Sequence, residues 1–161
     1  MHDSRIMKDK EWYHKIIGIY QIAGGLVGIL LVVWALFLTT SPSIEFDKLL
    51  PAVVFIISLS LYLFSILCGV LLYKKKKKAI NLSIVNQLMQ VISFSVSGFA
   101  FKYFSGLYIT ILIDFVSDIY SLEWGASSWH ISLGDIPDSG IIGINLFAVL
   151  IVIVLSKLKL E

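Results

Sequence analysis

The sequence predicts an all-α membrane protein, a four-transmembrane-helix bundle with a small external β-hairpin or three-stranded sheet between helices 3 and 4. Of the 161 residues, 58% are hydrophobic and only 15% are charged, whereas soluble domains average about 45–50% and about 25%. The hydrophobic residues also gather in long runs, which indicates a lipid environment rather than a large soluble core. We therefore treat residues 1–161 as a single transmembrane domain.

Four segments are expected to cross the bilayer. A helical span needs about 20 mainly apolar residues, because the hydrocarbon core is about 30 Å thick and each helical residue rises about 1.5 Å. The first three candidates contain no charged residue, and the fourth is short but ends at lysines that can snorkel to the interface. The expected spans cover about 16–38, 50–73, 79–101 and 140–157, and an external insert covers 102–139.

The lysines and the single arginine predict the orientation. Eleven of these 13 residues lie in the N-terminal tail, the second loop and the C-terminal segment, which four spans place on one side. Lysine and arginine favour the cytoplasmic side, so both termini are expected in the cytoplasm, and the lysine-rich composition suggests a bacterial inner membrane. The second loop is expected to set topology or to bind anionic lipid head groups. It consists of Lys74, Lys75, Lys76, Lys77 and Lys78.

Uncharged polar residues recur along the third span at steps of three and four, which places them on one face of a helix. Two interpretations stay open. The face packs against neighbouring helices through hydrogen bonds worth about 0.6 kcal/mol each, or it lines a pore in an oligomer. The residues of this face are Ser83, Asn86, Gln90, Ser93 and Ser97. The first span offers a packing face of its own, made of Gly18, Gln21, Gly24, Gly25 and Gly28.

The external insert carries alternating apolar and polar residues that predict strands. The stretch 125–128 is expected to be a hairpin loop, so that Trp124 would face Trp129 across two strands. The apolar face of this sheet either rests on the bundle as a lid or contacts a partner. The residues expected to make such contacts are Tyr120, Trp124, Trp129 and His130.

The expected function is non-enzymatic. Apart from Lys157 at the end of the fourth, no Asp, Glu, Lys, Arg or His lies inside an expected span, which disfavours proton relays and ion-coupled transport. No catalytic, metal-binding or phosphate-binding motif is present. We expect a small polytopic membrane protein that acts through protein–protein contacts, as a sensor, an immunity-type protein or an accessory subunit. Its partners would be the lipid bilayer, with anionic lipids at the five-lysine loop, and a second copy or another membrane protein, with no cofactor and no nucleic acid. The alternatives are an oligomeric channel lined by the third helix and, second, a membrane-embedded enzyme.

Overall fold

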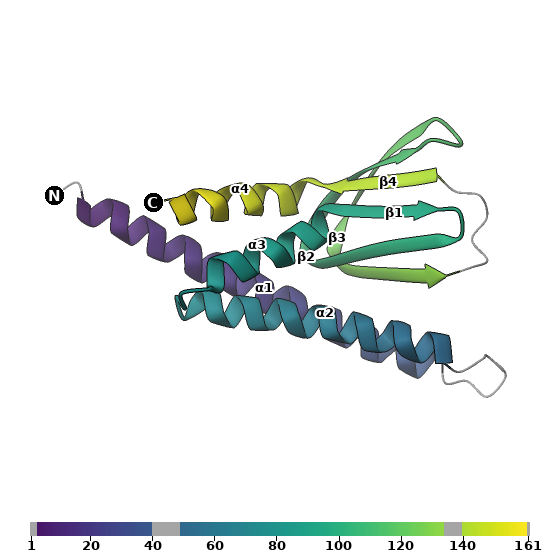
Figure 1. Cartoon of the computed structure of the whole chain (residues 1–161), viewed down its shortest axis with the longest axis horizontal. Helices are drawn as coiled ribbons and strands as arrows, with labels where there is room; N and C mark the ends of the chain where they lie inside the picture. Colours follow the sequence, from purple (N-terminus) through teal and green to yellow (C-terminus); the bar gives the residue numbers. More distant parts are fainter. Residues whose placement is uncertain (1–2, 40–48, 134–139, 161) are drawn as a thin grey trace.

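The computed structural model describes the backbone of residues 3–39, 49–133 and 140–160, and this part of the chain forms four helices and a four-stranded antiparallel sheet (Figure 1). The expected all-α four-helix transmembrane bundle is therefore wrong. The elements are α1 (Asp3–Thr39), α2 (Leu49–Tyr73), α3 (Ala79–Val91), β1 (Ile92–Val96), β2 (Phe99–Asp114), β3 (Ile119–Leu133), β4 (Gly140–Asn145) and α4 (Leu146–Leu160).

Helices α1 and α2 form a long antiparallel hairpin. Small residues bring their backbones together: a Cβ on Gly18 would lie 2.9 Å from the carbonyl oxygen of Gly69, and one on Gly28 would lie 2.0 Å from the ring of Tyr62. Two stretches, Trp12–Leu38 of α1 and Pro51–Tyr73 of α2, are long and apolar enough to cross a membrane.

The third and fourth expected spans are each part helix and part strand. Helix α3 has 13 residues and α4 has 15, so each reaches only about 20 Å, which is less than the hydrocarbon core. In the third segment the helix changes directly into β1, because Ile92 is already extended at φ −113° and ψ 131°. In the fourth, Asn145 ends β4 and caps α4, accepting a hydrogen bond from Phe147 N at 3.1 Å.

The β1–β2 hairpin explains the switch from helix to strand. Ile92, Phe94 and Val96 alternate with serines, a period of two that suits a strand. Val96 pairs with Phe99, so the turn between the strands consists of two residues, Ser97 and Gly98, both with positive φ. A two-residue turn of this kind matches the twist of paired strands, and it starts the sheet inside what the sequence predicted to be a helix.

The strand pairings close into a ring. β1 pairs with the first residues of β2 on one edge and with β4 on the other, and β4 pairs with β2 over Thr110–Asp114. All these pairings are antiparallel, so the two halves of β2 must run in opposite directions. β3 pairs along the whole of β2, and in the described part of the chain it has no other strand beside it.

The reversal of β2 takes place at Ser105 and Gly106. The pairing register with β3 shifts between Phe104 and Leu107, which marks a β-bulge. Gly106 has φ +101°, a conformation open to glycine and strained for other residues. β3 follows the same bend, so the two strands form one V-shaped ribbon (Figure 1). The expected hairpin loop at residues 125–128 is therefore wrong, because this stretch lies inside β3.

The bend also separates the two tryptophans that were expected to pair. Trp124 pairs with Ile109 in the second half of β2, and Trp129 pairs with Tyr103 in the first half. The chain reverses instead over residues 115–118, between the paired residues Asp114 and Ile119.

The start of α1, the lysine turn between α2 and α3, and the end of α4 lie at one end of the molecule (Figure 1). The strands lie beside the other half of the α1–α2 hairpin. Tyr103 of β2 donates a hydrogen bond to Leu61 O at 2.8 Å, and Trp129 of β3 packs against Phe55. Four helices thus surround the lysine end, and two helices plus the sheet surround the opposite end.

We predict that Gly24→Ala destabilises the fold. A Cβ on Gly24 would lie 2.3 Å from Gly106 N, so the ribbon must move, and such overpacking costs about 1–3 kcal/mol. In a free helix the same change would stabilise by about 1 kcal/mol, so the two effects have opposite signs. We expect the detergent-purified variant to have a lower thermal unfolding midpoint, measured by circular dichroism.

Ala23→Leu is the matched control, because Ala23 is the exposed neighbour of Gly24 on α1. This variant should change the free energy of unfolding by no more than about 0.5 kcal/mol. An unchanged or raised midpoint for Gly24→Ala would show that the helix and the ribbon do not touch at this point.

Candidate functional site

Polar side chains from three helices gather where the bend of the ribbon meets the helices. They are almost fully buried, and we call them the polar network. Its members are Gln21 of α1, Ser65 of α2, Ser83, Asn86 and Gln90 of α3, and Tyr103 and Ser105 of β2.

Ser65 lies at the centre of the polar network. Its Oγ accepts hydrogen bonds from Asn86 Nδ2 at 3.1 Å and from Ser105 Oγ at 2.8 Å, and donates to Gln21 O at 3.3 Å. Gln90 Oε1 accepts from Ser105 N at 2.8 Å. These bonds satisfy the backbone and side chain of β2 at its bend, where regular strand pairing is interrupted.

A second set of bonds ties the bend to α1. Ser127 Oγ of β3 donates to Gly24 O at 2.9 Å and accepts from Gly106 N at 3.0 Å. Tyr20 OH donates to Leu107 O at 2.8 Å. Ser127 thus bridges α1 and both strands of the ribbon at one point.

The structure places most of the predicted polar face in or beside this network. Ser83, Asn86 and Gln90 are buried inside one chain, and Ser93 is buried on β1. Ser97 differs, because it is exposed in the β1–β2 turn. Gln21 joins the network, and Gly24 makes the contact with the ribbon. The lysines Lys74, Lys75, Lys76, Lys77 and Lys78 form the exposed turn between α2 and α3.

The strands line an open cavity of about 440 Å³, which we call the sheet cavity. Within its lining, Lys102 and Glu123 carry opposite charges and form an ion pair. Tyr108 OH donates to Glu123 Oε1 at 3.1 Å, and Lys102 Nζ lies 5.5 Å from the centre of the Tyr108 ring. The remaining lining residues are Ser93, Phe94, Ser95, Ala100, Leu112, Ser128, Trp129, His130 and Ile141.

Sequence reasoning missed this ion pair. Glu123 stands between Leu122 and Trp124, and Lys102 stands between Phe101 and Tyr103, so both charges occupy the polar phase of an alternating strand. That alternation is a signal that places the two side chains on one face of a sheet. Strand pairing alone does not bring them together, because Lys102 pairs with His130 and Glu123 pairs with Thr110 in different halves of the ribbon. The bend of the ribbon, which the sequence analysis did not predict, makes the contact.

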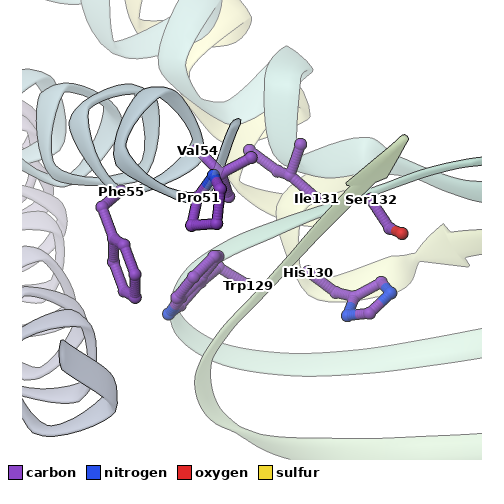
Figure 2. Close-up of a pocket in the computed structure, with 7 residues that line it drawn as sticks. All are labelled: Pro51, Val54, Phe55, Trp129, His130, Ile131 and Ser132. Atoms are coloured by element: carbon purple, nitrogen blue, oxygen red, sulfur yellow. The ribbon is translucent and has the colours of Figure 1, made fainter. Parts of the chain in front are cut away.

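A second cavity, of about 410 Å³, lies between the start of α2 and the end of β3. Figure 2 shows Trp129 turned toward Pro51 and Phe55, while His130 points away from the helix. The rings of Trp129 and Phe55 meet edge to face, with centroids 5.7 Å apart. Two of the expected contact residues, Trp129 and His130, therefore border both cavities.

The other two expected contact residues lie on the second half of the ribbon, which we call the distal arm and define as residues 107–126. Tyr120 is 75% exposed and Trp124 is 78% exposed, and Leu122 lies between them on the same face at 64%. At the tip, Val116 N donates to Asp114 Oδ1 at 2.9 Å, and this bond holds the pKa of the carboxyl below its usual range. The arm thus combines an apolar face with an acidic tip.

Comparison of the chain with protein-family models, curated proteins and solved structures finds no match. Among the residues that the structure describes, no group of three or more His, Cys, Asp or Glu side chains is arranged to hold a metal ion. The candidate sites therefore rest on the geometry of the polar network, the sheet cavity and the distal arm.

We predict that Asn86→Leu destabilises the protein by about 1–3 kcal/mol, because it leaves Ser65 and Tyr103 with a lost partner in a buried place. Asn86 Nδ2 donates to Ser65, and its Oδ1 lies 3.3 Å from Tyr103 OH. Asn81→Leu is the control, because Asn81 is exposed on the same helix. Thermal unfolding in detergent measures both, and equal midpoints for the two variants would contradict a structural role for the polar network.

Proposed function

We propose that this chain is a multi-pass membrane protein that acts by binding another protein through the distal arm. The observation that carries this proposal is the row formed by Tyr120, Leu122 and Trp124 on one face of β3. Exposed aromatic side chains in a contiguous apolar patch are typical of interaction surfaces. Such a protein would serve as a sensor, an immunity-type protein or an accessory subunit.

In this proposal α1 and α2 cross the bilayer, which for a lysine-rich chain of this kind is a bacterial inner membrane. The exposed lysine turn lies in the cytoplasm, as do the start of α1 and the end of α4 at the same end of the molecule. Support comes from the length and apolar character of Trp12–Leu38 and Pro51–Tyr73. The tip of the distal arm, at the opposite end, then faces the outside.

The free edge of β3 favours a protein over lipid as the occupant of the distal arm. Over residues 119–126 the outer edge of β3 has no strand beside it in the described part of the chain, so alternate N–H and C=O groups point outward unpaired. Lipid offers these groups no hydrogen bonds. An extended segment of a partner membrane protein would satisfy them by adding a strand and would cover the aromatic row at the same time.

The alternative function, an oligomeric pore lined by α3, has less support. Ser83, Asn86 and Gln90 make their hydrogen bonds within one chain and are buried there. A pore between protomers would need this face to leave its partners, each of which would then lose a hydrogen bond. We therefore place the interaction at the distal arm.

The orientation is tested by cysteine labelling in intact bacterial cells. The native thiol Cys68 is buried, and Cys68→Ser removes it from the background. We expect Ser117→Cys in the arm's turn to react with a membrane-impermeant maleimide, and Lys76→Cys to react only after the cells are permeabilised. The reverse pattern would invert the proposed orientation, and equal labelling of both would contradict a membrane span between them.

The partner contact is tested by photo-crosslinking. With p-benzoyl-phenylalanine at position 124, we expect an adduct to a protein, because Trp124, at 78%, is the most exposed residue of the row. The same probe at position 150 is the control, since Leu150 is 55% exposed on α4, away from the distal arm. The mass of the adduct identifies its occupant.

Two results of the crosslinking would contradict the proposal. Lipid adducts alone at position 124 would show that the distal arm faces the bilayer. Equal protein adducts at positions 124 and 150 would show that the contacts are nonspecific. An adduct to a second copy of the chain would replace the separate partner with a homodimer.

A further inference from the structure

The sheet cavity is the place where the described strands turn charged groups inward. Among the residues that line it, Lys102 and Glu123 are the two that carry full charges, and they come from β2 and β3. Leu122 and Trp124, on either side of Glu123, are exposed, whereas Tyr103, beside Lys102, is buried against α2. The cavity has a mixed lining, in which the ion pair and serine hydroxyls lie among apolar and aromatic side chains.

The ion pair keeps access to solvent. The side chain of Lys102 is 22% exposed and that of Glu123 is 33% exposed, so the two charges are partly hydrated and a ligand can reach them. Tyr108 orients the carboxylate, and the rings of Phe104 and Tyr108 lie 5.6 and 5.5 Å from the ammonium. Both charges are thus held in place before any ligand arrives, which lowers the cost of binding.

The charge balance selects the ligand. A simple anion at Lys102 would also meet the carboxylate of Glu123, and a simple cation at Glu123 would meet the ammonium of Lys102. A molecule with both charges can approach the pair without leaving either group unpaired, which matters because an isolated partly buried charge is costly. Serine hydroxyls on β1 and β3 supply further polar contacts, and the indole of Trp129 supplies an apolar wall.

We propose that the sheet cavity binds a small zwitterion that carries a primary ammonium and an anionic group. The anionic group contacts Lys102, and the ammonium contacts Glu123. The volume of about 440 Å³ falls within the range of about 300–1,000 Å³ found for small-molecule pockets. A free amino acid and the phosphoethanolamine head group of a lipid share this chemistry. The site is separate from the distal arm's outer face, so it stands whether or not that face binds a protein.

The test measures ligand binding to the full chain in a nonionic detergent by isothermal calorimetry and by thermal shift. We expect phosphoethanolamine or alanine to bind and raise the midpoint, while ethanolamine and glycerol phosphate, with one kind of charge each, bind at least tenfold more weakly. Comparable binding of the single-charge compounds would overturn the proposal. Failure of both zwitterions to bind would overturn it as well.

Two variants locate the binding. Glu123→Gln should weaken it at least tenfold, while Asp118→Asn, which removes a negative charge from the exposed turn, should leave it unchanged. Ile141→Phe fills part of the cavity without touching the ion pair, so it keeps the test valid if Glu123→Gln fails to fold. Full binding to Ile141→Phe would place the ligand elsewhere and overturn the proposal.

A comparison of two lipids distinguishes a lipid head group from a free zwitterion as the ligand. In nanodiscs that contain phosphatidylethanolamine, competition that weakens the binding of free phosphoethanolamine, relative to nanodiscs of phosphatidylglycerol, would identify the lipid head group as the occupant. Equal binding in both would identify a free zwitterion. Each result supports the same site, and the photo-crosslinking outcome at Trp124 has no bearing on it.

Discussion

Gly24 of α1 and Gly106 of β2 bring the backbone of a helix into direct contact with the backbone of a strand. A side chain at Gly24 would push the strand away, and one at Gly106 would strain the left-handed backbone and strike the ring of Tyr20. The contact sets the place where β2 reverses. Because β2 reverses there, β1, β2 and β4 can pair in a ring. β3 pairs with β2 and so lies beside the helices as well.

The polar groups of β2 at its bend need hydrogen-bond partners, and the helices supply them. A strand that turns sharply in a buried place loses regular pairing partners, and its polar groups must find others. Ser65, Asn86 and Gln90 supply them from two helices, and Ser127 supplies another from the neighbouring strand. These bonds give Ser65 and Gln90 a structural role at the bend. Their spacing along the chain could not reveal this role, because it depends on where β2 bends.

The sequence was sufficient for the two long apolar helices and insufficient for the sheet. The apolar runs of α1 and α2 are uninterrupted, so their length is visible. Ser93 and Ser97 fit a helical spacing, and together with Ser95 they also fit the period of two of a strand. Because the helical period was chosen, β1 was not predicted. The Ser97–Gly98 turn and the cap at Asn145 were local signals that favour the observed boundaries. The ion pair of Lys102 with Glu123, 21 residues apart, depends on the bend of the ribbon, because the two residues lie in different halves of it.

The distal arm and the sheet cavity are two sides of the same pair of strands. Leu122 and Trp124 face outward because Glu123 faces inward, and a slip of one residue would exchange the two sets. The bulge beside Gly106 and the contact with Gly24 hold that register. The aromatic row and Glu123 therefore depend on the same register, and a change that moves one set to the other face must move both.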